Sequence, residues 1–240
     1  MIKLKKERLL FILIAGLVFL FSMYLSPYYL YEDQLVYREA YEVVKNKGII
    51  DALLLYRSHI HSMELGHFFV IWLASDYIQK DIFMSIINAG TAYLGAYALN
   101  RVGAHPIVSF VVVLLGYYSW TLFLSAERLK FSVFFLLIAF FFQLNAKTKR
   151  AWFSYFSSVI THLQISIIIA LVVLKMYSRE YLNVFFKLKI SKKTMGVSLV
   201  AFFLALVVFV AFNSHLLSKI NAYHSSFGVS EYLRIFVFLY

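Results

Sequence analysis

Apolar runs of bilayer length recur along this chain and constrain its fold more than any other feature. A helix rises 1.5 Å per residue, so about 20 apolar residues cross the ~30 Å hydrocarbon core of a bilayer. The sequence predicts an all-α fold, a polytopic integral membrane helical bundle with about seven spans. The runs cover about residues 9–25, 65–75 (the shortest and weakest), 82–100, 105–125, 131–144, 151–174 and 194–213.

Composition supports the membrane class. Hydrophobic residues make up 62% of the chain and charged residues 15%, far from the usual balance of a soluble domain. Cysteine is absent, which excludes disulfides, a Cys-ligated metal and a cysteine nucleophile. The net charge of +11 comes from short basic clusters beside apolar runs, a pattern that favours anionic lipid over nucleic acid. We therefore expect no nucleic-acid partner. Nucleotide-binding motifs are also absent, so we expect no cofactor.

The chain reads as a single membrane domain over residues 1–240. A basic segment, 1–8, precedes the first run, and no small-residue cleavage site follows that run. We therefore expect an uncleaved first helix with its N-terminus in the cytoplasm, and an outward-facing loop at 26–63. The last run, 235–240, is long enough only to begin an eighth span, so we expect the chain to be truncated at its C-terminus.

If successive spans cross the membrane in alternate directions, the two basic loops cannot both obey the rule that places basic loops in the cytoplasm. Alternation places the 175–195 loop in the cytoplasm, as the charge rule requires, but places the basic residues at 147–150 outside. If the 105–125 run were re-entrant, residues 147–150 would return to the cytoplasm, and Glu127 and Arg128 would face outward. Both topologies remain open at this level.

The outward loop carries two amphipathic patterns. Apolar and aromatic residues at i, i+3, i+4 and i+7 predict one helix, and a shorter apolar pattern predicts a second. We expect both helices to lie along the membrane surface. The residues concerned are Tyr37, Ala40, Tyr41 and Val44, followed by Ile50, Leu53 and Leu54.

Glu127, Arg128 and Lys130 form the first candidate site, because they interrupt about forty otherwise uncharged residues. Arg supplies a planar bidentate fork and Lys a point charge, so the two together suit a phosphate or pyrophosphate group. The alternative is a span boundary, at which both cations snorkel to the headgroups and Glu127 pairs with them.

Carboxylates and histidines supply the other candidates. Asp33 and Glu64 lie at expected membrane boundaries and suit a general base on a sugar hydroxyl, although Asp33 equally suits a helix cap. His162 lies in the middle of the 151–174 run, as an interhelical hydrogen-bonding group or as a phosphate donor and proton-transfer group. The spacing His59-x-His61-x-x-Glu64-x-x-His67 matches no zinc motif, so we expect no metal site.

The ordered set of these marks resembles a known family. The marks are Asp33 followed by Tyr37 and Tyr41, Glu64 before an apolar run, Glu127-Arg128-x-Lys130 at the head of a Phe-rich run, and His162 followed by Ser166. This set resembles the bacterial O-antigen and exopolysaccharide polymerases of the Wzy and EpsG-like type, over nearly the whole chain. Two departures from the family pattern are that no Gln follows Arg128, and that Gln164-Ile165 intervenes before Ser166. Members of the family are typically longer.

The resemblance implies a glycosyltransferase at the outer face of the bacterial inner membrane. Such an enzyme transfers a growing glycan from polyprenyl pyrophosphate to a new lipid-linked repeat unit. Arg128 would stabilise the departing pyrophosphate, Asp33 or Glu64 would handle the acceptor hydroxyl, and His162 would support either group. Tyr56 would join two other tyrosines in stacking on sugars. The implied substrate-binding residues are Glu127, Lys130, Tyr37, Tyr41 and Arg57.

The implied partners are undecaprenyl-pyrophosphate-linked repeat units, membrane lipid, a chain-length regulator and a flippase. Three alternatives stay open. The chain could be a flippase or transporter for the same lipid-linked sugars, in which intramembrane charge lines a pathway. It could be an O-antigen ligase or a noncatalytic partner in an envelope assembly.

Overall fold

A computed structural model describes residues 2–30, 33–60, 64–163, 165–166 and 168–169. Every regular element in this part of the chain is a helix, which confirms the all-α class for the described residues. The account below concerns the compact unit that ends at Ile165. The expected basic loop at 175–195 and the runs at 194–213 and 235–240 lie outside the described residues.

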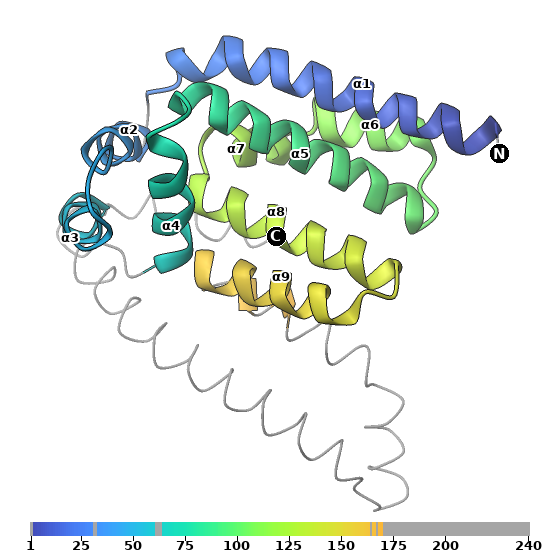
Figure 1. Ribbon diagram of the computed structural model, residues 1–240. Coiled ribbons are helices and arrows are strands. Elements are labelled where there is room, and N and C mark those ends of the chain that lie inside the picture. Colours follow the sequence, from blue (N-terminus) through green and yellow to red (C-terminus); the bar gives the residue numbers. More distant parts are fainter. Residues whose placement is uncertain (1, 31–32, 61–63, 164, 167, 170–240) are drawn as a thin grey trace, which may run out of the picture. The chain divides into compact units, whose positions relative to one another are not determined.

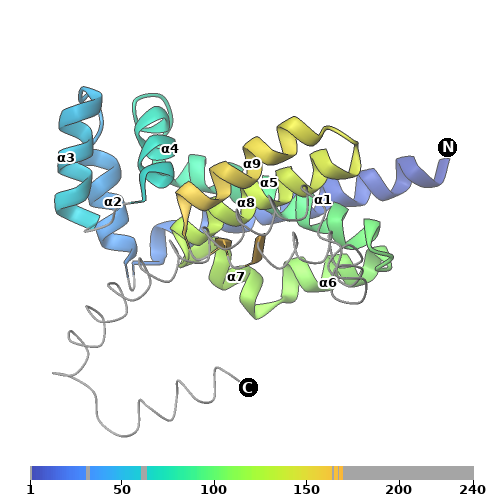
Figure 2. The ribbon, with the colours of Figure 1, turned by 90° about the horizontal axis from the view of Figure 1, so that it is seen from below.

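Four long helices lie side by side (Figures 1 and 2). They are α1 (Ile2–Leu25), α5 (Lys80–Arg101), α8 (Glu127–Leu144) and α9 (Thr148–Thr161). Helix α1 packs on α5, α5 on α8, and α8 on α9. Apolar side chains such as Phe11, Ile14 and Val18 are almost fully buried against α5, because they recur at i, i+3 and i+7 on one face of α1.

The described residues contain fewer helices able to cross a membrane than the sequence predicts for this part of the chain. Within the described residues, two stretches are long and apolar enough, Glu7–Tyr28 and Lys80–Arg101. Helices α6 (Pro106–Leu115) and α7 (Tyr117–Leu124) form a third if they count as one span, and they meet at an angle of 53°. The expectation of about seven spans is therefore not confirmed.

The bend between α6 and α7 is built into the sequence at Gly116. A Cβ at this position would lie 2.3 Å from the carbonyl oxygen of Val112, so the backbone requires glycine. The carbonyls released by the break are bonded by side chains. Ser119 Oγ donates to Val112 O at 2.8 Å, and Trp120 Nε1 donates to Leu114 O at 2.7 Å. Such pairing allows a helix to break inside an apolar bundle.

Three shorter helices gather at one end of the bundle (Figures 1 and 2). They follow a single 3₁₀ turn, η1 (Ser26–Tyr28), and are α2 (Gln34–Val43), α3 (Ile49–Ile60) and α4 (Leu65–Ser75). The first two are the amphipathic helices predicted for the outward loop, and α2 buries the expected face. Helix α4 has 11 residues and rises only about 16 Å, and it lies across the end of α5 and α8. The 65–75 run is therefore not a span.

Polar contacts fasten α2 to the bundle. Arg38 donates to both carboxylate oxygens of Asp81, at 3.1 and 2.7 Å, and also to Ser26. Tyr41 donates its hydroxyl hydrogen to the carbonyl of Ile78 at 2.8 Å. Because Asp81 belongs to the first turn of α5 and Ser26 follows α1, these bonds fix α2 against the ends of two long helices.

Candidate functional site

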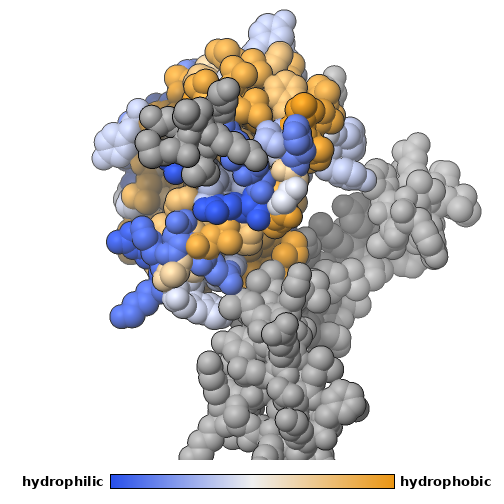
Figure 3. All heavy atoms as spheres, turned by 90° about the vertical axis from the view of Figure 1, so that its right-hand side faces the viewer, coloured by the Kyte–Doolittle hydropathy of each residue, from blue (hydrophilic) through white to orange (hydrophobic). Residues whose placement is uncertain are grey.

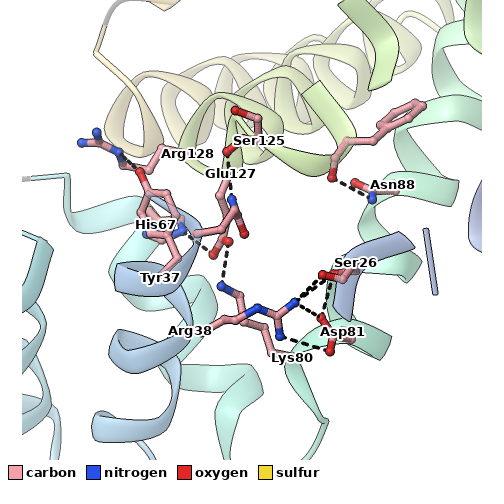
Figure 4. A network of polar contacts seen from close by, with 12 residues as sticks. Ser26, Tyr37, Arg38, His67, Lys80, Asp81, Asn88, Ser125, Glu127 and Arg128 are labelled. Atoms are coloured by element: carbon pink, nitrogen blue, oxygen red, sulfur yellow. Dashed lines mark hydrogen bonds and ion pairs between the residues drawn. The ribbon is translucent and has the colours of Figure 1, made fainter. Parts of the chain in front are cut away.

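The first turn of α8 carries two adjacent charged residues that belong to different clusters (Figure 4). Arg128 belongs to the outer cluster, which we define as Tyr37, Glu64, Arg128 and His162. Figure 4 shows the contact of Arg128 with Tyr37. Glu127 belongs to the inner cluster, which we define as Tyr56, His67, Lys80 and Glu127. Glu127 is the first residue of α8, where the positive end of the helix dipole stabilises its carboxylate.

The outer cluster joins four segments. Arg128 donates from Nη1 to Glu64 Oε2 at 2.8 Å and from Nε to the hydroxyl oxygen of Tyr37 at 2.7 Å. His162 donates from Nδ1 to the other oxygen of Glu64, Oε1, at 2.7 Å. The side chains of Arg128, Glu64 and His162 are 26%, 17% and 15% exposed, so water and solutes reach their edges.

A glycine lets Glu64 and His162 meet. A Cβ on Gly66 would lie 2.5 Å from Thr161 Oγ1 and 2.7 Å from the Thr161 backbone nitrogen, so α4 and α9 touch backbone to backbone here. Helix α9 ends at Thr161, and His162 has an extended backbone, with φ −153°. The expected continuous helix through 151–174 is therefore wrong at this point. His162 lies at a helix end beside a carboxylate and not in the middle of a helix.

The inner cluster is closed to solvent. Glu127 Oε1 accepts from His67 Nε2 at 3.3 Å, and Glu127 Oε2 lies 3.0 Å from Lys80 Nζ. Because His67 donates from Nε2, its Nδ1 accepts the hydroxyl hydrogen of Tyr56, at 2.8 Å. The side chains of His67, Glu127 and Lys80 are 0%, 1% and 6% exposed. Lys130 is buried one turn along α8.

The ring of Tyr37 separates the two clusters. The guanidinium of Arg128 lies 6.0 Å from the ring centroid, and Lys80 Nζ lies 5.7 Å from it. The ring of His67 approaches it edge-on, with centroids 5.5 Å apart. Cations attract the faces of aromatic rings, so Tyr37 stabilises both Arg128 and Lys80 without a carboxylate.

Burial and neighbouring charges shift the pKa values of Glu64 and Tyr37 in the outer cluster. Burial raises the pKa of Glu64, but the hydrogen bond from His162 and the charge of Arg128 outweigh it and hold the pKa below its usual value. Burial also raises the pKa of Tyr37 to about 12, against the lowering influence of Arg128. Glu64 is therefore an anion at neutral pH, whereas Tyr37 keeps its hydroxyl hydrogen.

Other predicted site residues lie apart from the outer cluster. Asp33 is exposed at the start of α2, and its side chain does not cap that helix. Tyr41 and Tyr56 are each 1% exposed. Arg57 is half-buried on α3, and its Nε has no hydrogen-bond partner among the described residues.

The expected stacking of Tyr37, Tyr41 and Tyr56 on sugar rings does not fit this arrangement. All three rings are covered, and even Tyr37 is only 4% exposed. We therefore assign them packing and positioning roles. The described residues also contain no group of three His, Asp or Glu side chains placed to hold a metal ion.

The roles of two residues of the inner cluster, His67 and Lys80, are not predicted from the sequence. His67 is noticed only as a metal ligand, and Lys80 reads as the ordinary basic flank of the 82–100 run. A usable signal is present nonetheless. Lys80-Asp81 stands at the head of one apolar run, and Glu127-Arg128-x-Lys130 stands at the head of another. The first charged residue of one run, Lys80, is a cation, and that of the other, Glu127, is an anion. Such residues can form an ion pair if the two helix starts lie side by side.

The fold and the site define a class: an all-helical arrangement of the described residues, with apolar helices able to cross a membrane and paired charges gathered at one end. Comparison of the chain with protein-family models, with curated proteins and with solved structures finds no match.

Proposed function

We propose that this protein is a polysaccharide polymerase, a membrane glycosyltransferase that uses a polyprenyl-pyrophosphate-linked glycan as its donor. The observation that carries the proposal is the outer cluster itself. Glu64, Arg128 and His162 stand as far as 98 residues apart in the sequence, yet they form one hydrogen-bonded set. These are three of the four residues to which the family resemblance gives catalytic roles.

Arg128 is the group that stabilises the leaving pyrophosphate. Negative charge develops on the phosphate oxygens as the glycosidic bond breaks, and a guanidinium at a partly exposed edge can meet that charge. Lys130 is only 2% exposed, so it adds positive potential at the head of α8 and does not contact the pyrophosphate.

Glu64 is the better base of the two predicted carboxylates, because Asp33 has no described contact with Arg128 or His162. In the proposed step, Glu64 takes the proton of the acceptor hydroxyl, whose oxygen attacks the anomeric carbon of the donor. The bond from that carbon to the pyrophosphate oxygen breaks, and the electron pair leaves with the pyrophosphate. His162 holds the carboxylate in place through Nδ1.

The position of α4 supports an orientation in the bacterial cytoplasmic membrane. Because α4 lies across the bundle end, α1, α5 and the bent α6–α7 pair suffice to bring the chain from a cytoplasmic N-terminus to an outward Arg128. The orientation also requires α8, whose 18 residues rise about 27 Å, to cross back and carry residues 147–150 to the cytoplasm, as the charge rule requires. Figure 3 faces this opposite end, where hydrophilic side chains gather and Arg101, Lys147 and Arg150 are exposed.

The orientation is testable because the chain has no cysteine. Asp51→Cys and Lys149→Cys each introduce one thiol, at exposed positions on opposite ends of the bundle. A membrane-impermeant maleimide added to intact spheroplasts should label the first variant and spare the second until the membrane is opened. Labelling of Lys149→Cys in intact spheroplasts would overturn the orientation.

A lipid-linked sugar transporter is the second candidate, and the bent α6–α7 pair favours it. Broken helices are common at transporter binding sites because they expose backbone groups in the membrane. The two functions differ in the product that accumulates when the protein is lost, since a transporter acts before any unit reaches the outer face.

The test is deletion of the gene in the source strain, followed by restoration at its own locus. A polymerase predicts that the ladder of surface polysaccharide collapses to carrier bearing one repeat unit, and that restoration returns the ladder. Loss of even the single unit would favour the transporter or a ligase. A ladder unchanged by deletion would contradict the polymerase.

A further inference from the structure

Glu64 binds Arg128 and His162 with separate carboxylate oxygens, and this division suggests a second role. We propose that Glu64 competes with the pyrophosphate of the donor for Arg128, so that donor binding releases Glu64 from the guanidinium and leaves it held by His162. The identity of the competing ligand rests on the proposed function. The competition itself is a property of the contacts in the outer cluster.

The chemistry of the guanidinium makes the competition direct. Carboxylate and phosphate are the two groups that match the planar donor fork of Arg. Glu64 Oε2 already takes a donor of that fork at 2.8 Å, so a phosphate oxygen seeking the same N–H must displace it. Arg128 is 26% exposed, which gives an incoming anion an edge to approach.

Of the two carboxylates, Glu64 and Glu127, only Glu64 lies where an incoming anion can replace it. Glu127 and its partner Lys80 are 1% and 6% exposed, so no anion reaches them without opening the fold. Glu64 is also the residue that immediately precedes α4, and its side chain makes no capping bond to that helix. Its carboxylate therefore leaves Arg128 without breaking a helix cap.

Release from Arg128 makes Glu64 a stronger base toward the acceptor hydroxyl. The charge of Arg128 is one of the causes that hold the pKa of Glu64 down. A bound pyrophosphate neutralises that charge, so the carboxylate becomes a stronger base when the donor is in place. The bond from His162 to Oε1 keeps the carboxylate near the site during the exchange.

The proposal predicts an affinity change opposite in sign to that of a simple ligand residue. The measurement is calorimetric titration of the purified chain in detergent with inorganic pyrophosphate. Glu64→Gln should bind about three- to tenfold more tightly than the natural chain, because the competing charge is gone. Asp51→Asn removes an exposed carboxylate from the first turn of α3 and should leave the affinity unchanged.

A second substitution tests whether the tighter pyrophosphate binding of Glu64→Gln depends on Arg128. In the double variant Glu64→Gln with Arg128→Gln, the extra affinity should disappear, because the guanidinium that receives the anion is absent. Equal or weaker binding by a folded Glu64→Gln overturns the proposal, and so does a gain that survives in the double variant. If Glu64→Gln does not fold, Glu64→Asp should show a smaller gain, and a folded Glu64→Asp without any gain overturns the proposal.

The polymer ladder separates this inference from the proposed function. If the deletion leaves the ladder unchanged while Glu64→Gln still binds pyrophosphate more tightly, the competition holds and the polymerase assignment fails. If the deletion collapses the ladder while Glu64→Gln shows no gain, the polymerase assignment holds and the competition fails.

Discussion

The outer and inner clusters use similar side chains, yet they differ in exposure. Each has one carboxylate, one cation, one histidine and one tyrosine, and each includes a residue of the first turn of α8. The charged side chains of the outer cluster are about a fifth exposed, and those of the inner cluster almost fully buried. A buried ion without its partner is strongly destabilising, whereas an ion at an edge can exchange partners. On this difference in burial rests our proposal that the inner cluster stabilises the fold and the outer cluster exchanges ligands.

The sharpest way to break this comparison is Glu127→Ala. The substitution leaves Lys80 and Lys130 buried without their carboxylate, which should cost about 3–5 kcal/mol of folding free energy. The thermal midpoint in detergent, followed by circular dichroism, measures the loss. Glu42→Ala removes an exposed carboxylate from α2 and should change the stability by less than about 0.5 kcal/mol. Equal stability of the two variants would contradict the assigned role of the inner cluster.

A smaller effect is expected where the outer cluster depends on close packing. Gly66→Ala places a methyl group against the Thr161 backbone, so α4 must move away from α9 and Glu64 away from His162. Overpacking of this kind typically costs about 1–3 kcal/mol. The matched control is Gly95→Ala, whose methyl group meets nothing within 4 Å and should leave the thermal midpoint unchanged or raised. Indistinguishable midpoints would mean that α4 and α9 do not touch as described.

The smallest expected effect is a pH dependence carried by Glu64. Its pKa is lower in the folded protein than the usual 4.5, so its pairing contributes fully above that value and is lost as the pH falls through the folded pKa. The midpoint difference between the natural chain and Glu64→Gln should therefore be larger near pH 7 than near pH 3. A difference that does not shrink in acid would show that the carboxylate is not held as an anion.

The sequence predicts helix positions well where one side of a helix is apolar. The spacing of Tyr37, Ala40 and Tyr41 predicts α2, because residues at i, i+3 and i+4 share a face. The same spacing does not separate the two tyrosines by role, although Tyr37 bonds Arg128 and Tyr41 bonds a backbone carbonyl. That difference depends on packing partners some 40 to 90 residues away.

Long-range contacts also explain the errors at α4 and His162. An apolar run of 11 residues fits a short span or a helix that lies across a bundle, and only its neighbours decide between them. His162 reads as a mid-span histidine because the residues around it are apolar. Its partner Glu64 lies 98 residues earlier and comes within reach only because Gly66 has no side chain.

The most direct test of the central claim is to replace Arg128 by Lys at the chromosomal locus and to compare the surface polysaccharide ladder with that of Arg150→Lys. Both substitutions keep a positive charge, but only the first removes a guanidinium from the outer cluster. We predict short polymer for Arg128→Lys, with an unchanged amount of protein in the membrane, and a full ladder for Arg150→Lys. A full ladder for Arg128→Lys would contradict the assignment of Arg128 as the group that binds the leaving pyrophosphate.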